Sequence, residues 1–508
     1  MKLRRDALAA LSGALVALSF PKFGHPAVAW VALVPLLVAV AEDGGKGAFR
    51  LGYVSGAASA LGLLYWTSFV VVQYGGLSLP VGLCVMVLLC LAVALFPSLF
   101  AWAVGRWVSA YGTRALLLAP VAWVATEILR THTFFRFPWC LLGYSQQPNL
   151  PFIQIARYGA VYAVSFLVAG ASSALAYSVI ERRAGPRRAT LLALFAVLAA
   201  VGLHGAWQMS RPLPRTGSLR VGLVQARILQ EQKWDEARAL DNVEQHVRLT
   251  QRAAAEGARL VVWPESAVPY YYDETPAVAR RLQDLSRERG IYLLFGNDDR
   301  EEGNRGDESV FVGAKMLSPQ GELTYRYHKM HLVPFGEYVP MRPLLTLGGR
   351  MAAKLVQQVA DFTPGTEPTL GDVDGHSIGA FICYEAIFPD LVRGFAARGA
   401  DLLVNITNDA WYGRTSAPHQ HLEMAAFRAV ETGKYLVRAA NTGITAVVDP
   451  RGRVVVGSAL FDRTVVAREV PLVSGTTFYV RHGDVFAWSC LGGALVLTAG
   501  TLIRARTA

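Results

Sequence analysis

The sequence predicts an α/β domain inserted into an eight-helix polytopic transmembrane bundle. Of the 508 residues, 53% are hydrophobic and 17% are charged, whereas about 25% of the residues of an average soluble domain are charged. Apolar segments fill the beginning of the chain and recur at its end, and the region between them is polar. We therefore divide the chain into a seven-span region (1–210), an outer α/β domain (211–482), and an eighth helix with its tail (483–508).

The apolar segments give the count of eight spans. Leu51 to Gly105 contains no charged residue and is too long for one span, which needs about 20 residues. It breaks at Gln73–Gly76, where two glycines follow Gln73 and Tyr74, and so predicts two helices. The remaining predicted spans are Ala7–Phe20, Pro26–Ala41, Ala115–Leu129, Tyr158–Ile180, Ala189–Ser210 and Val485–Ile503.

The lysines and arginines of the short loops predict the orientation, because cytoplasmic loops carry an excess of them. Alternate loops are basic here, so we expect both termini in the cytoplasm and the inserted domain outside, in the periplasm of a bacterium with two membranes. For the first span, a cleaved signal peptide is an alternative, but no small-residue cleavage site follows Leu18. The basic loops hold Lys2, Arg4, Arg5, Lys46, Arg50, Arg106, Arg114, Arg182, Arg183, Arg187, Arg188, Arg504 and Arg506; the opposite loops hold Lys22, Arg130 and Arg136.

Two features of the apolar half allow more than one interpretation. Glu127, near a helix end, could pair with Arg130, but a single ion pair is weak support for a transport path. The aromatic, proline-rich loop 134–151 could be a re-entrant or interfacial segment, or part of an ordinary aromatic belt. The net charge of +11 suits contact with anionic lipid, and we expect no nucleic-acid partner.

The polar region predicts a layered sheet with helices outside, because short β-rich runs alternate with amphipathic helices. The predicted strands are Leu219–Gln225, Arg259–Trp263, Ile291–Phe295, Ser309–Ser318, Ile378–Cys383, Leu402–Ile406, Tyr435–Ala440, Thr445–Val448 and Val454–Val456. The predicted helices are Asp235–Gly257, Pro276–Gly290, Pro389–Gly399 and His419–Gly433, and a turn is predicted at Asp449–Gly452.

Three reactive side chains stand beside apolar strands of this region. Glu265 follows an apolar run directly, Lys329 lies in a segment with Glu337, and Cys383 ends a strand and is followed by Tyr384 and Glu385. A lone cysteine is usually a core residue, but a cysteine at a strand end beside carboxylates favours a nucleophile. A free thiol has a pKa of about 8.5, so Glu265 could accept its proton while Lys329 stabilises the thiolate and then an oxyanion. Sequence spacing alone does not bring the three together.

The histidines do not predict a metal site. His328 and His331, and likewise His419 and His421, are close in sequence, but neither pair has a carboxylate or thiol at convincing ligand spacing. We expect no metal and no soluble cofactor. Cys383 is the one cysteine of the polar region, so that region cannot form an internal disulfide.

The segments Trp263-Pro264-Glu265, His328-Lys329 and Cys383-Tyr384-Glu385 resemble the catalytic motifs of the nitrilase superfamily. This resemblance implies an αββα sandwich over roughly 218–470, with Glu265 as general base, Lys329 as electrostatic stabiliser and Cys383 as nucleophile. The membrane half and stretches such as Phe137-Pro138-Trp139 and Gly143–Gln146 resemble, more narrowly, the apolipoprotein N-acyltransferase family. Through that resemblance, supporting roles are also implied for Trp234, Glu337, Tyr384 and Glu385.

The family resemblance implies a two-step acyl transfer. An acyl chain would pass from a membrane phospholipid, chiefly phosphatidylethanolamine, to Cys383, and then to the α-amine of the N-terminal diacylglyceryl-cysteine of an apolipoprotein. Both substrates are held in the bilayer by their chains, at about 0.8 kcal/mol per buried methylene, so catalysis is expected at the outer surface of the inner membrane. Tyr270–Tyr272 and Met341–Ala352 are candidate lipid-contacting lids, although the tyrosines could equally be surface packing.

Two other function classes remain open at this stage. A membrane-tethered nitrilase-type amidase would share the three catalytic residues but would not need eight spans. The other is a membrane sensor or transporter whose outer domain only binds acyl or amide ligands. Such a protein would not need the three catalytic residues to be intact.

Overall fold

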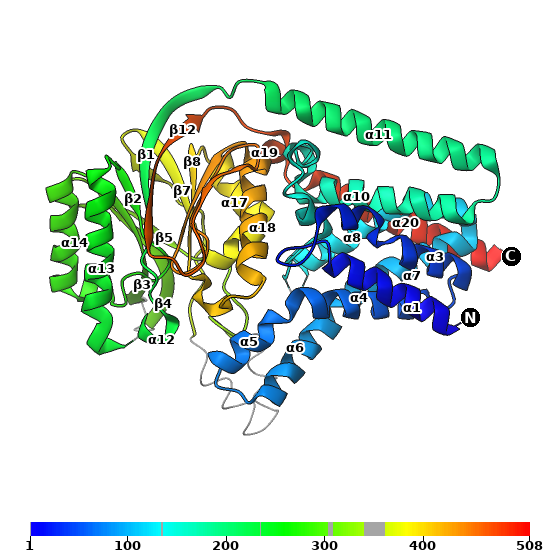
Figure 1. Ribbon diagram of the computed structural model, residues 1–508, viewed down its shortest axis with the longest axis horizontal. Coiled ribbons are helices and arrows are strands. Elements are labelled where there is room, and N and C mark those ends of the chain that lie inside the picture. The colour runs from blue at the N-terminus through cyan, green and yellow to red at the C-terminus, as the bar shows by residue number, and fades with distance from the viewer. Residues whose placement is uncertain (1, 134–135, 234, 303–307, 340–360, 508) are drawn as a thin grey trace.

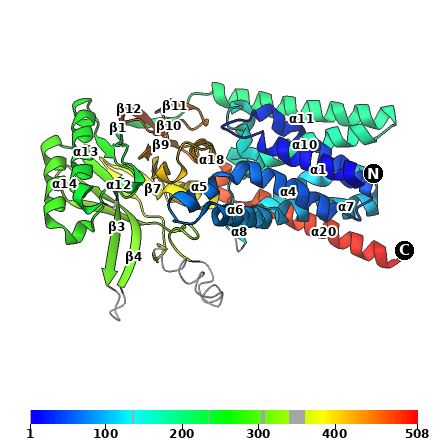
Figure 2. The same cartoon turned by 60° about the horizontal axis from the view of Figure 1, so that its bottom comes forward.

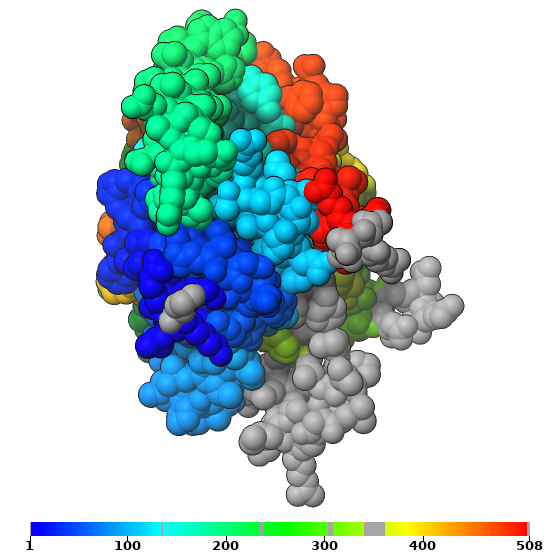
Figure 3. All heavy atoms as spheres, turned by 90° about the vertical axis from the view of Figure 1, so that its right-hand side faces the viewer, coloured from blue at the N-terminus to red at the C-terminus, as the bar shows by residue number. Residues whose placement is uncertain are grey.

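The computed structural model describes residues 2–133, 136–233, 235–302, 308–339 and 361–507. A helical bundle and an α/β domain lie end to end along the long axis of the molecule (Figure 1). Both chain termini lie at the end of the bundle that faces away from the α/β domain, and Figure 3 looks onto that end. This arrangement agrees with the predicted insertion of the domain between the first spans and the last.

The bundle contains long apolar helices, as expected for a membrane protein. Within the described residues, five helical segments are long and apolar enough to span a bilayer, and the pair α4–α5, bent by 53°, makes up to six. Two predicted spans correspond to α1 and α8, which have 16 and 14 residues and fall short of the usual 20. The count of eight spans therefore stays a prediction.

The helix bounds follow the predicted apolar segments closely. The predicted break at Gln73–Gly76 lies between α5 and α6. Helix α11 lies along the outside of the bundle (Figures 1 and 2). The helices are α1 (Lys2–Ala17), α2 (Ala29–Ala32), α3 (Val34–Asp43), α4 (Ala48–Leu64), α5 (Trp66–Gln73), α6 (Leu79–Val93), α7 (Leu95–Tyr111), α8 (Ala119–His132), α9 (Leu150–Ile153), α10 (Ala156–Ile180), α11 (Ala184–Ser210) and α20 (Val485–Thr507).

The outer domain is a sandwich of two six-stranded sheets, ordered β12-β1-β2-β3-β4-β5 and β11-β10-β9-β8-β7-β6. Strands β1, β2 and β3 run parallel, as do β7, β8 and β9. The strands are β1 (Arg215–Gln225), β2 (Leu260–Val262), β3 (Tyr292–Glu302), β4 (Glu308–Leu317), β5 (Leu323–His328), β6 (Gly371–Val373), β7 (His376–Ile382), β8 (Leu402–Thr407), β9 (Tyr435–Ala440), β10 (Ala446–Val448), β11 (Val454–Gly457) and β12 (Thr464–Val473).

Helices cover both outer faces of the sandwich, as predicted. Helices α13 (Glu236–Ala255) and α14 (Pro276–Arg289) cover the first sheet, and α17 (Pro389–Ala397) and α18 (Ala417–Thr432) lie between the second sheet and the bundle (Figure 1). The short helices α12 (Gln230–Lys233) and α19 (Phe478–His482) complete the domain.

Both faces of the first sheet are buried, and the side chains along each strand point alternately to one face and the other. Leu260 and Val262 of β2 belong to the core between the sheets, while Val261 and Trp263 pack with the residues of α13 and α14, because successive side chains point to opposite faces. The predicted strands and helices are all found, with ends shifted by a few residues. Strands β5, β6 and β12 were not predicted.

The loop after α8 corrects two expectations. Arg130 does not pair with Glu127: it donates to the carbonyl oxygens of Phe137 (2.7 Å) and Trp139, while Glu127 accepts from Trp123 and from the Leu142 N–H (2.8 Å). Both charged side chains thus fasten the loop that follows. An aromatic belt would expose its rings to lipid, but Trp139 is fully buried. The belt interpretation is therefore wrong for Trp139, and residues 138–146 form a buried contact between bundle and domain.

Candidate active site

Cys383 lies at a sharp elbow between β7 and the single 3₁₀ turn Cys383–Ile387. Its φ of +50° is in the left-handed region, which costs a non-glycine residue about 1–3 kcal/mol and persists only when surrounding contacts enforce it. The residue is 5% exposed. A strained, buried elbow of this kind points to a functional cysteine rather than an ordinary core residue.

Glu385 supplies several of the contacts that enforce the elbow. One carboxylate oxygen accepts from the Ile382 N–H (2.7 Å). The other accepts from the Tyr327 hydroxyl (2.8 Å) and the Met330 N–H (2.7 Å). Glu385 therefore ties the strand that carries Cys383 to the segment that carries Lys329.

Lys329 follows β5 directly and is fully buried. Its Nζ donates to Oε1 of Glu265 (3.2 Å) and Oε1 of Glu337 (2.5 Å). Burial alone would lower the pKa of Lys329, but the two carboxylates outweigh it and hold that pKa well above its usual range. The site therefore keeps a permanent positive charge.

The two carboxylates beside Lys329 are themselves held by backbone N–H groups. Glu265, three residues beyond the end of β2, accepts at Oε2 from the Asn408 N–H (2.8 Å). Glu337 accepts at Oε2 from the Val333 N–H (2.9 Å). Each carboxylate thus has one oxygen on Lys329 and the other on the main chain, which fixes its orientation.

The thiol of Cys383 rests in the protonated form. Burial and the nearby negative charge of Glu265 raise its pKa, and the Lys329 ammonium opposes them. A nucleophile in this state needs a base at the moment of attack, and Glu265 is the carboxylate that acts on its pKa most strongly. The structure thus brings together Glu265, Lys329 and Cys383, together with Glu337 and Glu385.

The other predicted residues lie at the elbow, in the domain core or outside the described part of the chain. Tyr384 donates its hydroxyl to the Arg136 carbonyl (3.1 Å), so it joins the elbow to the loop of the bundle. Trp234 and the candidate lid Met341–Ala352 lie outside the described residues. Tyr272 is buried with its ring 5.4 Å from that of Phe295, so it packs in the domain core, and the lid interpretation of this tyrosine is wrong.

Sequence reasoning missed two charged residues next to Glu265. Lys233 is buried and donates to the Glu265 carbonyl oxygen (2.9 Å), and burial lowers its pKa to about 8. Burial raises the pKa of Asp298 to about 7, and the Ser266 hydroxyl lies 3.5 Å from its carboxylate. No local pattern marked Asp298, which lies among the polar residues Asn297–Glu302 of β3.

Among the described residues, one histidine, His328, belongs to a group of side chains that could hold a metal ion. Asp299, Glu301 and His328 are the one group in the described residues whose ligand atoms lie within 4.8 Å of one another. Their charges are already paired, because Lys315 (3.0 Å) and Arg326 (2.9 Å) both contact Asp299. The group is an ion-pair network on one face of β3, β4 and β5.

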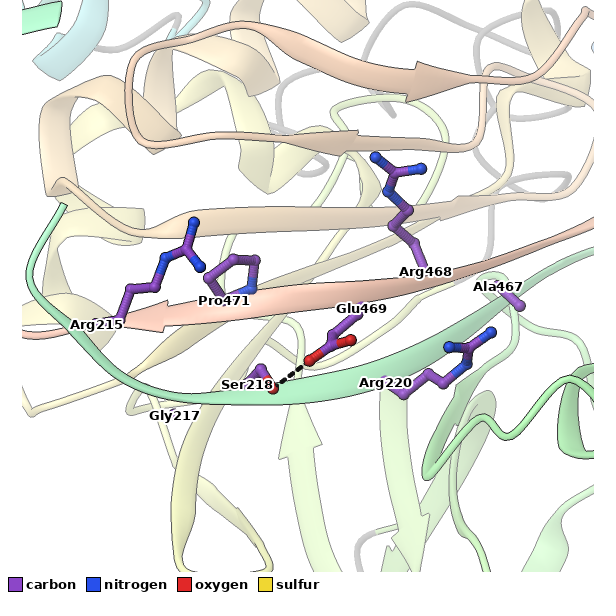
Figure 4. A pocket seen from close by; sticks show the side chains of 8 residues that line it. All are labelled: Arg215, Gly217, Ser218, Arg220, Ala467, Arg468, Glu469 and Pro471. Atoms are coloured by element: carbon purple, nitrogen blue, oxygen red, sulfur yellow. Dashed lines mark hydrogen bonds between the residues drawn. The ribbon is translucent and has the colours of Figure 1, made fainter. Parts of the chain in front are cut away.

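A separate groove of about 630 Å³ lies over the paired strands β1 and β12, and its lining includes Arg215, Arg220 and Arg468 (Figure 4). Across it, Ser218 donates to Glu469 (2.6 Å). The groove lies along the first half of β1, whereas Glu265 follows the carboxyl end of the parallel neighbour β2. It therefore does not belong to the site around Cys383.

Comparison with known proteins covers both halves of the chain. Residues 220–478 match the carbon-nitrogen hydrolase family, and residues 12–174 match the apolipoprotein N-acyltransferase N-terminal domain. The apolipoprotein N-acyltransferase of Geobacter metallireducens is 42% identical over 98% of this chain and 95% of its own, and that of Methylococcus capsulatus is 35% identical over 96% and 93%.

Among solved structures, an amidase of the nitrilase superfamily from Nesterenkonia aligns with 24% identity and a TM-score of 0.38, covering 51% of this chain and 94% of that one. The two curated relatives are more than 30% identical over nearly the full length of this chain, and this identity shows the family. The chain belongs to the apolipoprotein N-acyltransferase family.

Proposed function

We propose that this protein transfers an acyl chain from a membrane phospholipid, through a thioester on Cys383, to the α-amine of the N-terminal diacylglyceryl-cysteine of an apolipoprotein. The observation that carries the proposal is the buried Lys329 ammonium, held between the Glu265 and Glu337 carboxylates next to the strained Cys383 elbow. Membership of the acyltransferase family over nearly the whole chain favours this reaction over hydrolysis of small amides.

In the first step, Glu265 accepts the thiol proton as Sγ of Cys383 attacks the ester carbonyl carbon of the phospholipid. The negative charge that develops on the carbonyl oxygen is stabilised by the Lys329 ammonium and by the N–H of Tyr384, the residue after the nucleophile. The ester C–O bond then breaks, Glu265 returns the proton to the departing alkoxide, and a lysophospholipid leaves. The thioester remains on Cys383.

In the second step, the α-amine of the acceptor attacks the thioester carbonyl carbon. Glu265 accepts a proton from the amine, and the same donors stabilise the second oxyanion. The C–S bond breaks, an amide forms, and the thiolate of Cys383 recovers the proton from Glu265. The resting state is thereby restored with atoms and charge balanced.

The remaining residues hold these groups in place. Glu337 orients Lys329, Glu385 holds the elbow, and Tyr384 links it to the bundle. We retain Trp234 as a supporting residue on the family resemblance alone. Because Lys329 and Glu265 are both buried, water is kept from the site, which protects a thioester from hydrolysis.

The proposed setting is the outer face of a bacterial inner membrane, with the α/β domain in the periplasm. The alternation of basic loops supports this orientation, and the two termini at the far end of the bundle are consistent with it. Phosphatidylethanolamine is the proposed donor. We keep 1–210, 211–482 and 483–508 as the functional divisions of the chain.

The test is intact-protein mass spectrometry of the detergent-purified full chain after incubation with phosphatidylethanolamine alone. We expect a gain of one acyl mass that hydroxylamine removes and that Cys383→Ser lacks. Glu265→Gln and Lys329→Met should each slow its appearance by about 10²-fold or more, in line with the loss of one oxyanion donor or catalytic base.

Two results would contradict the proposal. One is the absence of an acyl adduct with any phospholipid; the other is turnover of small amides at a rate that phospholipid does not compete with. Replacing phosphatidylethanolamine by phosphatidylglycerol tests the headgroup separately, because a faster adduct with phosphatidylglycerol would overturn only the choice of donor.

A further inference from the structure

A second buried cluster lies directly behind the Cys383 elbow. Its members are Asp409, His421 and Arg438, each at most 1% exposed. They come from the turn after β8, from α18 and from β9. Three polar side chains from three elements, all withdrawn from water, require a reason beyond packing, because burying polar groups is costly unless their hydrogen bonds are made.

The hydrogen bonds of the cluster lead to the backbone carbonyl of the nucleophile, Cys383. Nε2 of His421 lies 3.0 Å from the carbonyl oxygen of Cys383. On the other side of the ring, Nδ1 of His421 lies 3.0 Å from a guanidinium nitrogen of Arg438 and 3.0 Å from Oδ1 of Asp409. The same guanidinium nitrogen donates to Oδ2 of Asp409 (2.8 Å). The Thr407 hydroxyl donates to the other oxygen of Asp409 (2.9 Å).

These partners fix which ring nitrogen donates to Cys383. A carbonyl oxygen only accepts, so Nε2 of His421 carries the hydrogen. In the neutral ring Nδ1 then accepts from Arg438, whereas a protonated Nδ1 would donate to Asp409. Burial and the charge of Arg438 lower the pKa of His421, which favours the neutral ring. Arg438 and Asp409 hold the ring with Nε2 toward the Cys383 carbonyl.

The bond to the Cys383 carbonyl also fixes the direction of the next N–H. A trans peptide is planar, so its C=O and the following N–H point in opposite directions. With the Cys383 carbonyl held against His421, the Tyr384 N–H points in the opposite direction within the same plane, away from His421. That N–H is the second oxyanion donor of the proposed mechanism.

We propose that His421 is a positioning residue that holds the Cys383–Tyr384 peptide so that the Tyr384 N–H donates to the oxyanion of acyl transfer. Asp409 and Arg438 assist by holding the ring of His421. The inference rests on the proposed function, since it concerns the oxyanion of that reaction.

The same ring joins the elbow to the membrane half. The ring of His421 lies 5.6 Å from that of Trp139, whose Nε1 donates to Gln420 (2.8 Å). A substitution that removes only the nitrogens of His421 must therefore keep an aromatic ring, or it would also open a cavity against Trp139. His421→Phe meets this requirement, and His421→Gln restores a donor close to the position of Nε2.

The experiment measures two rates in the full-length protein in detergent. One is the rate of acyl-enzyme formation from phosphatidylethanolamine, which passes through an oxyanion; the other is the rate of Cys383 alkylation by iodoacetamide, which does not. We expect His421→Phe to slow acylation by about 10- to 100-fold while alkylation changes by less than about threefold, because a lost oxyanion donor costs up to about 10²–10³. His421→Gln should recover most of the acylation rate.

His419→Phe is the matched control, on the same helix and outside the cluster, and should leave both rates unchanged. The inference is overturned if His421→Phe acylates at the wild-type rate. It is also overturned if both rates fall together or if His421→Gln is as slow as His421→Phe, because the defect would then be in the whole site. Failure of the wild-type protein to form any acyl-enzyme would instead refute the proposed function.

Discussion

At the scale of single residues, two buried lysines flank Glu265 and act on different parts of it. Lys329 contacts the carboxylate, whereas Lys233 holds the backbone carbonyl of Glu265. A hydrogen bond from a charged donor contributes about 1.5–3 kcal/mol, so Lys233→Met should slow acyl-enzyme formation by about tenfold or more. This rate is measured by stopping the reaction at set times and determining the acylated fraction of the protein by intact-mass spectrometry.

Lys434 offers a matched control for that substitution. It is also buried and donates to a backbone carbonyl, that of Val473 (2.8 Å), but it does not contact Glu265. Lys434→Met should lower the thermal unfolding temperature without slowing acylation. Equal loss of acylation in both variants would show that the effect of Lys233 is general stability.

The raised pKa of Asp298 predicts how the stability of the folded protein changes with pH. Its pKa is raised from about 3.9 in an unfolded chain to about 7 by burial, with Glu265 and Glu337 adding and Lys233 opposing. The folded protein holds this proton more tightly than the unfolded chain does. The contribution of Asp298 to the free energy of unfolding is therefore fully present below about pH 4 and is lost as the pH rises to about 7.

The difference in unfolding temperature between the wild type and Asp298→Asn isolates this carboxyl, since asparagine does not titrate. Relative to the variant, the wild type should lose stability from about pH 4 to 7 and change little above it. A difference that is flat over this range, or that increases, would show that Asp298 is ionised in the folded state throughout.

At the scale of elements, the loop after α8 packs against two neighbours of Cys383, because Arg136 accepts from Tyr384 and Trp139 lies beside His421. Trp139 is fully buried with its ring 4.8 Å from Trp66 and 5.8 Å from Tyr412. Truncating a buried tryptophan costs about 3–5 kcal/mol, so Trp139→Ala should lower the unfolding temperature and slow acylation. Thermal unfolding in detergent measures the first effect.

Trp102, on α7, is the control because it is 38% exposed on an apolar helix. Trp102→Ala should change the unfolding temperature much less than Trp139→Ala does. If the two variants proved equal, the loop would not be the structural contact that its burial indicates.

The elements differ in how well local sequence predicts them. Helix α14 was predicted from Pro276 at its start and Gly290 beyond its end, and Gly290 adopts a φ of +61° there. Strand β5 was missed because it precedes Lys329 in a segment whose charged and aromatic residues resemble a loop. Its strand conformation depends on antiparallel pairing with β4, a contact that neighbouring residues do not encode.

At the scale of the whole molecule, the bundle and the domain form one continuous core. Arg428 of α18 is fully buried and donates to Tyr144 (2.8 Å) and Glu431 (2.9 Å), and Glu431 accepts from the Val161 N–H of α10 (2.9 Å). A fragment limited to 211–482 would expose this face and lose the loop behind His421. The catalytic domain should therefore not work alone.

The expected result for that fragment is self-association in size-exclusion chromatography with light scattering, no acyl adduct, and no hydrolysis of small amides. The full chain in detergent serves as the comparison. A monomeric fragment that hydrolyses amides would favour the membrane-tethered amidase over the acyltransferase.

The sequence by itself indicated the apolar helical region and the α/β class of the polar region, and it predicted three reactive residues. These depend on hydropathy, alternation and capping, which are local properties of the chain. The family resemblance then implied that Glu265, Lys329 and Cys383 act together in one site, which sequence spacing alone does not show.

Only the tertiary structure decided which groups meet. Glu265 and Lys329 are 64 residues apart in sequence yet 3.2 Å apart in space, and Lys233, Asp298 and His421 were recognised as neighbours of the site only once the sheets and helices were packed. The physical reason is that a hydrogen bond across elements depends on the packing of both sheets and the bundle, and no short segment of sequence specifies that packing.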